Sequence, residues 1–556
     1  LDELENDDPV GDPTDPIDII LQPPLNACGD VTDEDSGEED NLNINNLPGG
    51  QLQAEAEVLG QHSLDDEERA STSKKKKGNT YKWTKKIRSL PDRPGNFTDN
   101  VVDDDISPSE MFFSFFDDEL IYHLVTESNK YAAHKNRLGN ITEEEMKYFI
   151  AILLLSGYVP VPRRRMYWEL SKDTHNELVA NAMSRDRFEF IMSNFHIASN
   201  DSLDKEDKFA KVRPLFTHLN TKFKLHAPKE EHHSVDEAMV PYYGRHGCKQ
   251  FIRGKPVRYG YKMWVGATRL GYVLWMEPYQ GSGTKICEEY KNVGLGAAVV
   301  LQYSDVLLSL EHLPYHLYFD NFFTSLPLLE ELEKRNIKGT GTIRENRTQK
   351  CPLIDNTSMK KLQRGSYDFK MSQDTNIILC KWHDNSIVTL ATNGYSVEPI
   401  HNVKRYSQKE KKRVTVEQPH MIHQYNIFMG GVDRCDQNVS LYRVSIRGKK
   451  WYFPLIAQCV DMAEQNAWQL HKKRGGKMDH LEFRRRIVNA VLSGNKTPKR
   501  GTGRPGRAEN LDIRNDRLDH MVEPQEKQTR CRLCHTKCLT RCRKCDVGLH
   551  VKCFIE

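Results

Sequence analysis

The spacing of apolar residues changes along the chain, and these changes set the order of the parts that can fold. Residues 107–225 repeat apolar side chains at helical spacing, and Thr142 with Glu145 forms a capping-box pattern at the start of one predicted helix. After His233 the apolar period approaches two, as in strands, and strand-like and helix-like segments alternate up to residue 345. This alternation predicts an α/β core that follows a mostly helical region.

Charge is distributed unevenly along the 556 residues. Residues 1–70 hold 21 acidic residues and one arginine, a net charge of −20, whereas residues 71–556 have a net charge of +22. A basic body predicts a polyanionic partner, most commonly nucleic acid, and a lysine-rich surface that only aids solubility is the alternative. The longest strongly apolar run, Phe149–Val159, is shorter than the ~18 residues of a membrane span. We therefore expect an intracellular protein without a membrane partner.

The N-terminal region, residues 1–104, is acidic and poor in aromatic residues. Such a segment cannot offset its ordering entropy by burial, so it is predicted to be disordered. A basic run at 74–88 is typical of a nuclear-localisation signal or a nucleic-acid patch, although a solvated linker explains it equally well. On this basis we expect the protein to lie in the nucleus.

Four aspartates stand out from their local patterns. Asp236 and Asp320 occupy or end apolar strand-like segments, and Asp433 and Asp436 are spaced to share one face of a helix. Carboxylates buried together are costly unless cations neutralise them, and two Mg²⁺ ions ~3.5–4 Å apart would do so at a phosphodiester. For any single aspartate, a turn or a helix cap is the simpler explanation, and spacing alone does not show that the four converge.

Cysteines and histidines close the chain at spacings typical of tetrahedral zinc. The eight candidate ligands are Cys531, Cys534, His535, Cys538, Cys542, Cys545, His550 and Cys553. They form four pairs, enough for one or two Zn²⁺ ions. In one cross-brace division the first pair shares an ion with the third, and the second pair with the fourth. The assignment stays open, because two of the ligands, Cys534 and His535, are adjacent.

Three sequence blocks resemble the signature blocks of piggyBac-type transposases. The blocks are SVDEAMVPYYGR, YFDNFFTS followed by GTGTIREN, and MGGVDRCDQN followed by KKWYFPL, and they occur in the family's order within a resemblance over roughly 105–475. The resemblance implies an RNase H-like catalytic core with an inserted β-rich domain. It implies that Asp236, Asp320 and Asp433 coordinate two Mg²⁺ or Mn²⁺ ions, with Asp436 supporting the site.

The resemblance also implies a cut-and-paste reaction on double-stranded DNA. Family members cleave at terminal inverted repeats through hairpin intermediates, insert at TTAA targets, act as homodimers and carry a zinc-binding domain that helps to recognise the terminal DNA. The expected segments are a disordered region at 1–104, helical dimerisation and DNA-binding parts at 105–230 and 443–493, catalytic-core parts at 231–345 and 420–442, an insertion at 346–419, a basic linker at 494–530 and a zinc domain at 531–556.

Candidate DNA contacts follow the third acidic block and continue in the linker. They are Arg443, Arg447, Lys449, Lys450, Trp451 and Arg504. The first four suit phosphate contacts, with a solvated surface as the alternative, and Trp451 matches a conspicuous family tryptophan, with a core position as the alternative. Arg504 lies in TGRPGR, which is similar to a minor-groove AT-hook core, although an ordinary linker explains this short match better.

Three functions fit these observations. The first is an active, metal-dependent transposase. The second is a domesticated, catalytically silent protein that keeps sequence-specific DNA binding. The third is a zinc-based protein-interaction or ubiquitin-ligase module attached to an inactive core. Intact acids at all four positions favour the first.

Overall fold

The computed structural model describes ten ranges with side chains, together with the backbone of two short strands, β1 (Asp18–Leu21) and β2 (Ala56–Leu59). The ranges are 81–91, 93–98, 106–252, 257–281, 284, 286–290, 292–408, 410–493, 520–544 and 547–555. The chain divides into two compact units, residues 1–496 and residues 497–556.

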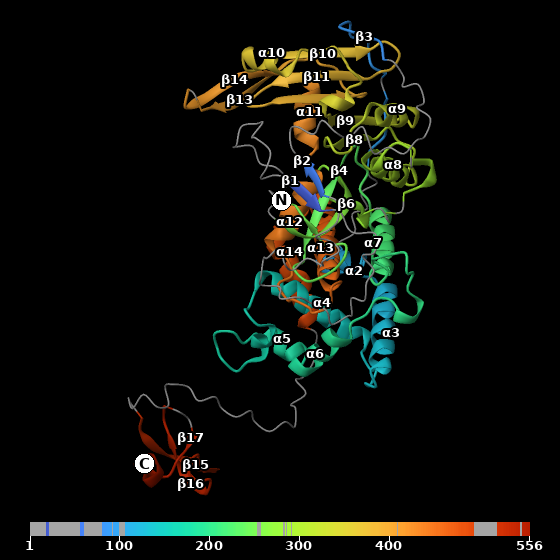
Figure 1. Ribbon diagram of the computed structural model, residues 1–556. Helices are drawn as coiled ribbons and strands as arrows, with labels where there is room; N and C mark the ends of the chain where they lie inside the picture. Colours follow the sequence, from blue (N-terminus) through green and yellow to red (C-terminus); the bar gives the residue numbers. More distant parts are fainter. Residues whose placement is uncertain are drawn as a thin grey trace, which may run out of the picture. The chain divides into compact units, whose positions relative to one another are not determined.

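Strands of the expected α/β core form one half of the largest sheet (Figure 1). They are β4 (His232–Pro241), β5 (Gln250–Phe251), β6 (Tyr259–Thr268), β7 (Val273–Pro278), β8 (His316–Phe319) and β9 (Lys338–Thr342). β4 pairs in parallel with β8 and β8 with β9, whereas β6 pairs antiparallel with β4, β5 and β7. Helices α8 (Leu295–Leu308) and α9 (Leu326–Lys334) precede β8 and β9, because parallel neighbours need long crossover connections. This mixed sheet confirms the α/β class.

The sheet continues into the segment expected to be an insertion. β10 (Tyr367–Ser372), β11 (Ile378–His383) and β12 (Ile387–Thr392) add antiparallel strands beyond β9. A separate hairpin joins β13 (His401–Ser407) to β14 (Lys412–Gln418). Both groups of strands share a second hydrophobic core, whose buried members include Met371, Ile378, Trp382, Leu390 and Val416. The insertion therefore has a core of its own while three of its strands extend the central sheet.

Part of the region expected to be disordered is ordered against this extension. β3 (Trp83–Thr84) pairs with β10, and the Arg88 guanidinium donates 2.9 Å hydrogen bonds to two backbone carbonyls at the end of β10 and just beyond it. The prediction of disorder across 1–104 is therefore wrong for its described part from residue 81 onward. The basic run at 74–88 is divided: its last residues lie on the sheet edge, and Lys74–Lys77 lie outside the described residues.

Helices from two distant parts of the sequence pack into one helical body. The first set is α2 (Pro108–Phe113), α3 (Asp118–His134), α4 (Glu143–Tyr158), α5 (Glu177–Ala182), α6 (Arg185–Asn194) and α7 (Arg213–Leu225). The second is α13 (Phe453–Lys473) and α14 (His480–Leu492). The predicted capping box of α4 is confirmed, and α4 is apolar on nearly every side because α3, α13 and α14 surround it.

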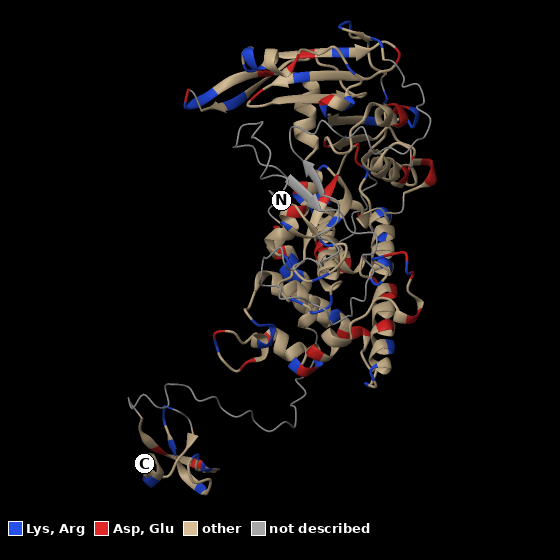
Figure 2. Ribbon diagram, in the orientation of Figure 1, with Lys and Arg blue, Asp and Glu red and all other residues tan. Residues whose placement is uncertain are grey.

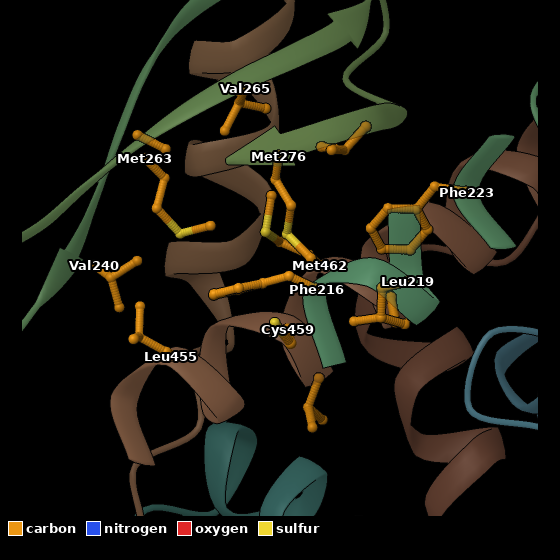
Figure 3. Close-up of a cluster of buried hydrophobic side chains, with 14 of the residues drawn as sticks. Phe216, Leu219, Phe223, Val240, Met263, Val265, Met276, Leu455, Cys459 and Met462 are labelled. Atoms are coloured by element: carbon orange, nitrogen blue, oxygen red, sulfur yellow. The ribbon is translucent and has the colours of Figure 1, made fainter. Parts of the chain in front are cut away.

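Helices α7 and α13 attach this body to the sheet (Figure 3). Phe216, Leu219 and Phe223 of α7 lie beside Leu455, Cys459 and Met462 of α13 and the inward side chains of β4, β6 and β7, namely Val240, Met263, Val265 and Met276. The sheet is thereby fixed against the helical body. Among the described residues, no helix combines the length and apolar character that a membrane crossing demands.

The C-terminal unit is a small sheet with one short helix. Its elements are β15 (Val522–Arg530), β16 (Lys537–Cys542), β17 (Val547–Gly548) and α15 (Val551–Ile555). β15 pairs with β16, and β16 with β17. The folded unit therefore begins inside the segment 494–530 that was expected to be linker, because β15 supplies an edge strand that the zinc-ligand pattern does not reveal.

Candidate catalytic, DNA-binding and metal sites

Asp236 and Asp320 lie next to each other on parallel strands. Asp236 belongs to β4, and Asp320 is the first residue after β8. The register pairs Val235 with Phe319, so the following residue of each strand occupies neighbouring positions. Both aspartates are half-buried, and a backbone amide just downstream donates to the Oδ1 atom of each, at 2.8 and 2.9 Å. Two carboxylates this close repel each other unless a cation lies between them.

A helix from the far end of the core brings in the third acid. α12 (Gly431–Leu441) begins against β4, where the backbone amide of Val432 donates to Ser234 Oγ at 3.1 Å. A Cβ atom on Gly431 would lie 2.4 Å from the carbonyl oxygen of Thr268, so only glycine permits this approach. Asp433 lies in the first turn of α12 and is exposed.

Tyr425 lies within electrostatic reach of the three carboxylates. It lies on α11 (His420–Phe428), just before α12. Burial raises the pKa of the Tyr425 phenol well above its usual range, and the negative charges of Asp320, Asp236 and Asp433 raise it further. Sequence reasoning missed Tyr425, whose only local signal is its position on a helix eight residues before Asp433.

The donor set at the carboxyl end of β8 fits Mg²⁺ or Mn²⁺. It consists of carboxylate oxygens, the ligands that these cations prefer. The oxygens of Asp236, Asp320 and Asp433 are not all within 4.8 Å of one another, and two ions ~3.5–4 Å apart would draw on all three carboxylates. Asp436 lies one helical turn beyond Asp433 and is half-buried, so it can support the site from the same helix face.

A cationic cavity of about 460 Å³ lies beside the turn that follows Asp320. Lys262 lines it and is only 3% exposed; its Nζ lies over the rings of Trp264 (4.2 Å) and Phe322 (4.9 Å) and has no hydrogen bond or ion pair among the described residues. The uncapped start of α8 opens into the same cavity. A buried ammonium and a helix N-terminus together form a site for an anion such as phosphate.

Basic residues gather on two further surfaces. Arg163–Arg165 and Arg447 line a cavity of about 580 Å³ on the helical body, and Lys449 is exposed close by in sequence. The β13–β14 hairpin also carries a dense group of Lys and Arg (Figure 2). Arg163–Arg165 were not selected from the sequence, although three consecutive arginines after a buried helix are a recognisable signal.

Lys450 and Trp451 are buried, which corrects their prediction as DNA contacts. Lys450 Nζ donates to the carbonyl oxygen of Phe195 at 2.8 Å, and the Trp451 ring stacks on His246 with centroids 4.1 Å apart. Both side chains thus hold the core together. Arg443 is half-buried and donates to a glutamine on α13 at 2.6 Å, and Arg504 lies outside the described residues.

Four of the eight candidate zinc ligands form one compact group in the C-terminal unit. The ligand atoms of Cys531, Cys534, His550 and Cys553 all lie within 4.8 Å of one another. Burial acts to raise the pKa of the Cys531 thiol, but hydrogen bonds from backbone amides outweigh it and lower the pKa to about 6. Because the thiolate is the form that binds metal, this Cys₃His group fits one tetrahedral Zn²⁺.

The other candidate ligands do not join this group. His535 is exposed, at a φ of 58° in the turn after Cys534. Cys538 and Cys542 are four residues apart on β16, about 13 Å along an extended strand, so they cannot share one ion. Cys545 lies outside the described residues. The first ligand pair thus meets the fourth pair, which differs from the one cross-brace division considered for an assignment that the sequence left open. Cys542 Sγ instead lies 3.4 Å from His520 Nδ1.

Comparison with known proteins identifies the class to which the chain belongs. A family model described as Transposase IS4 matches residues 107–468, the span that contains all four candidate acids. The chain is 44% identical to human PiggyBac transposable element-derived protein 3 over 586 aligned positions, covering 100% of this chain and 98% of that protein. It is 42% identical to human PiggyBac transposable element-derived protein 2, covering 97% and 92% of the two chains. The chain therefore belongs to the piggyBac transposase family.

A solved structure supports the same fold. The cryo-EM structure of a piggyBac transposase synaptic complex with hairpin DNA matches with a TM-score of 0.60 and 21% identity, covering 81% of this chain and 98% of that chain. At this identity the likeness concerns the fold alone. The resemblance found in the sequence is thereby confirmed at the level of family and fold.

Proposed function

We propose that the protein is a metal-dependent DNA transposase that cleaves and joins DNA strands at terminal inverted repeats, with an RNase H-like core and TTAA as its target. The observation that carries the proposal is that the parallel register places Asp236 and Asp320 on neighbouring strands, while the start of α12, which carries Asp433, packs against β4. Neighbouring carboxylates repel one another, and two divalent cations would neutralise them and give the cluster a chemical task.

Each group in this region has a distinct task in the proposal. The three aspartates hold and orient two Mg²⁺ or Mn²⁺ ions, which would supply charge stabilisation at the phosphodiester. Lys262 and the start of α8 bind a neighbouring phosphate and so position the strand. Arg163–Arg165, Arg447 and Lys449 contact the duplex backbone on the helical body. The zinc-bearing C-terminal unit takes part in recognising the terminal DNA.

Its cellular setting follows from the same proposal. A transposase must reach chromosomal DNA, so we propose nuclear localisation. Joining two DNA ends requires two active sites, so we propose a homodimer. Neither property is needed for the chemistry of one site, and each can be measured separately.

A catalytically silent, sequence-specific DNA-binding protein is the second candidate. The observation that favours it is the full-length similarity to human proteins named as derived from a transposable element. In this case the cationic surfaces would keep their role and the aspartates would not. The two candidates differ in one outcome, strand cleavage.

The test is DNA cleavage by the purified full chain with candidate terminal-repeat duplexes. We expect Mg²⁺-dependent cleavage that falls by more than about 100-fold in Asp320→Asn, because losing only an outer partner of a metal ligand already costs about 10–100-fold. Asp374→Asn is the matched control, since Asp374 is exposed in the turn between β10 and β11. Equal cleavage by the two variants would refute the assigned site. Tight, sequence-specific binding by the wild type without cleavage would favour the silent protein.

A further inference from the structure

A second group of metal-type side chains lies at the opposite end of the same strands. His232, His316 and Lys338 are the first residues of β4, β8 and β9, and the parallel register places them in one row. Glu231 immediately precedes His232. One ligand atom from each of Glu231, His232 and His316 lies within 4.8 Å of the others.

Each histidine has one ring nitrogen occupied by a hydroxyl. His232 Nδ1 lies 3.2 Å from the Tyr318 hydroxyl, and His316 Nε2 lies 2.7 Å from Thr340 Oγ1. His316 is fully buried, yet its Nδ1 has no hydrogen-bond partner among the described residues. Metal-binding histidines are typically oriented in this way, with the second nitrogen held by an oxygen and the first left for the ion. An unpartnered buried nitrogen is costly, and an ion would satisfy it.

The carboxylate of Glu231 is held so that it can serve the same ion. Its Oε1 accepts from Lys338 Nζ at 3.3 Å, while Oε2 is 4.0 Å from His232 Nε2. Ligand atoms around tetrahedral Zn²⁺ are roughly 3.3 Å apart, so a small inward rotation closes the set. Glu231 and His232 are half-buried, which leaves an open side for entry and for a fourth ligand.

We propose that Glu231, His232 and His316 bind a divalent transition-metal ion of the zinc class, at a site separate from both the aspartate centre and the Cys₃His group. Two imidazoles and one carboxylate are a donor set that zinc accepts and that Mg²⁺ does not favour.

The site lies under the helix that leads to Asp433. Phe428, at the end of α11, stacks on the His232 ring with centroids 3.6 Å apart and also contacts Tyr318. Asp236 and Asp320 follow the two histidines by four residues, about 13 Å along the strands and on the same sheet face. A bound ion would therefore fix the underside of α11, and through it the start of α12.

The test counts zinc in the full-length chain after chelation and dialysis against buffered Zn²⁺. Excess Mg²⁺ occupies sites made of oxygen ligands, and Cys531→Ser/Cys534→Ser removes the sulfur site. We compare variants of the Cys531→Ser/Cys534→Ser chain in excess Mg²⁺. In this parent we expect Glu231→Gln to hold one zinc fewer per chain and to bind Zn²⁺ with an affinity at least tenfold lower. Glu230→Gln is the matched control, because Glu230 is the adjacent glutamate and bonds to Lys473 instead. It should keep the ion.

Equal zinc content in Glu231→Gln, Glu230→Gln and the parent would overturn the proposal. Circular dichroism checks that each variant is folded. If Glu231→Gln is not folded, His232→Gln is scored in its place, and zinc retained there overturns the proposal equally. Because the readout is zinc content, the result does not depend on whether the protein cleaves DNA.

Discussion

Gly431 should control the reactivity of the candidate catalytic centre, although its own side chain contributes no chemistry. A Cβ atom at this position would lie 2.4 Å from the Thr268 carbonyl oxygen and 2.6 Å from Ser234 Oγ, whereas ordinary contacts begin at 3.4 Å. Both obstacles belong to the sheet, and one is backbone. In Gly431→Ala the start of α12 must therefore move away by about 1 Å, and Asp433, two residues later, must move with it.

The size of the effect follows from that displacement. A misplacement of about 1 Å in a catalytic group costs about 100-fold in rate, so strand cleavage should fall by this factor. Overpacking of this kind costs about 1–3 kcal/mol of stability, which corresponds to a fall of several degrees in melting temperature for a large domain. The rate loss exceeds what a small change in folded fraction would produce, because such a protein stays almost entirely folded at the assay temperature.

Gly430→Ala is the control for this prediction. Gly430 immediately precedes Gly431, has an ordinary φ of −77°, and an added Cβ would meet nothing within 4 Å. Its cleavage rate should match the wild type, and its stability should change by less than about 1 kcal/mol. Cleavage is measured with terminal-repeat duplexes, and stability by thermal unfolding. If both alanine variants cleave and melt alike, close contact between α12 and the sheet does not position Asp433.

Two further predictions concern buried ionisable side chains, one lysine and two histidines. Lys262→Met should weaken DNA binding, and the slope of a log–log plot of the binding constant against salt concentration should become shallower by about 0.9. Fluorescence anisotropy can measure both effects. The exposed Lys360→Met is the control and should change the affinity less, and equal effects of the two substitutions would remove Lys262 from the DNA site. Burial lowers the pKa of His233 to about 4 and that of His246 to about 3, so as the pH falls the two histidines are protonated first in the unfolded chain. The contribution of the two neutral histidines to the free energy of unfolding is complete above about pH 6.5, the pKa of an unfolded histidine. Below that pH it is lost, at up to about 1.4 kcal/mol per pH unit for each histidine. Urea unfolding at pH 7 and pH 5 should show this loss, and a His246→Phe variant whose stability fell as steeply between the two would contradict it.

Local patterns in the sequence predicted the elements that local interactions determine. The capping box of Thr142 and Glu145 marked α4, and the shift of the apolar period toward two after His233 marked the strands of the core. β3 escaped prediction, because a two-residue strand owes its existence to the edge of β10 and to anchors such as Arg88. Within the candidate site, the family blocks identified the aspartates. No local pattern could identify Tyr425, because two of the three carboxylates that affect its pKa, Asp236 and Asp320, are distant in sequence.

The two buried lysines show why residue type alone did not separate structural from functional cations. Lys450 follows a basic cluster and was predicted to contact DNA, yet its ammonium is satisfied by the Phe195 carbonyl and by His196 Nδ1 at 3.2 Å. Lys262 lies in an apolar strand and attracted no attention, yet its ammonium faces aromatic rings and an open cavity. Burying an ammonium is costly unless a partner compensates it. Lys450 has that partner within the protein, whereas Lys262 has ring faces that compensate it only in part, and an incoming phosphate would complete the rest.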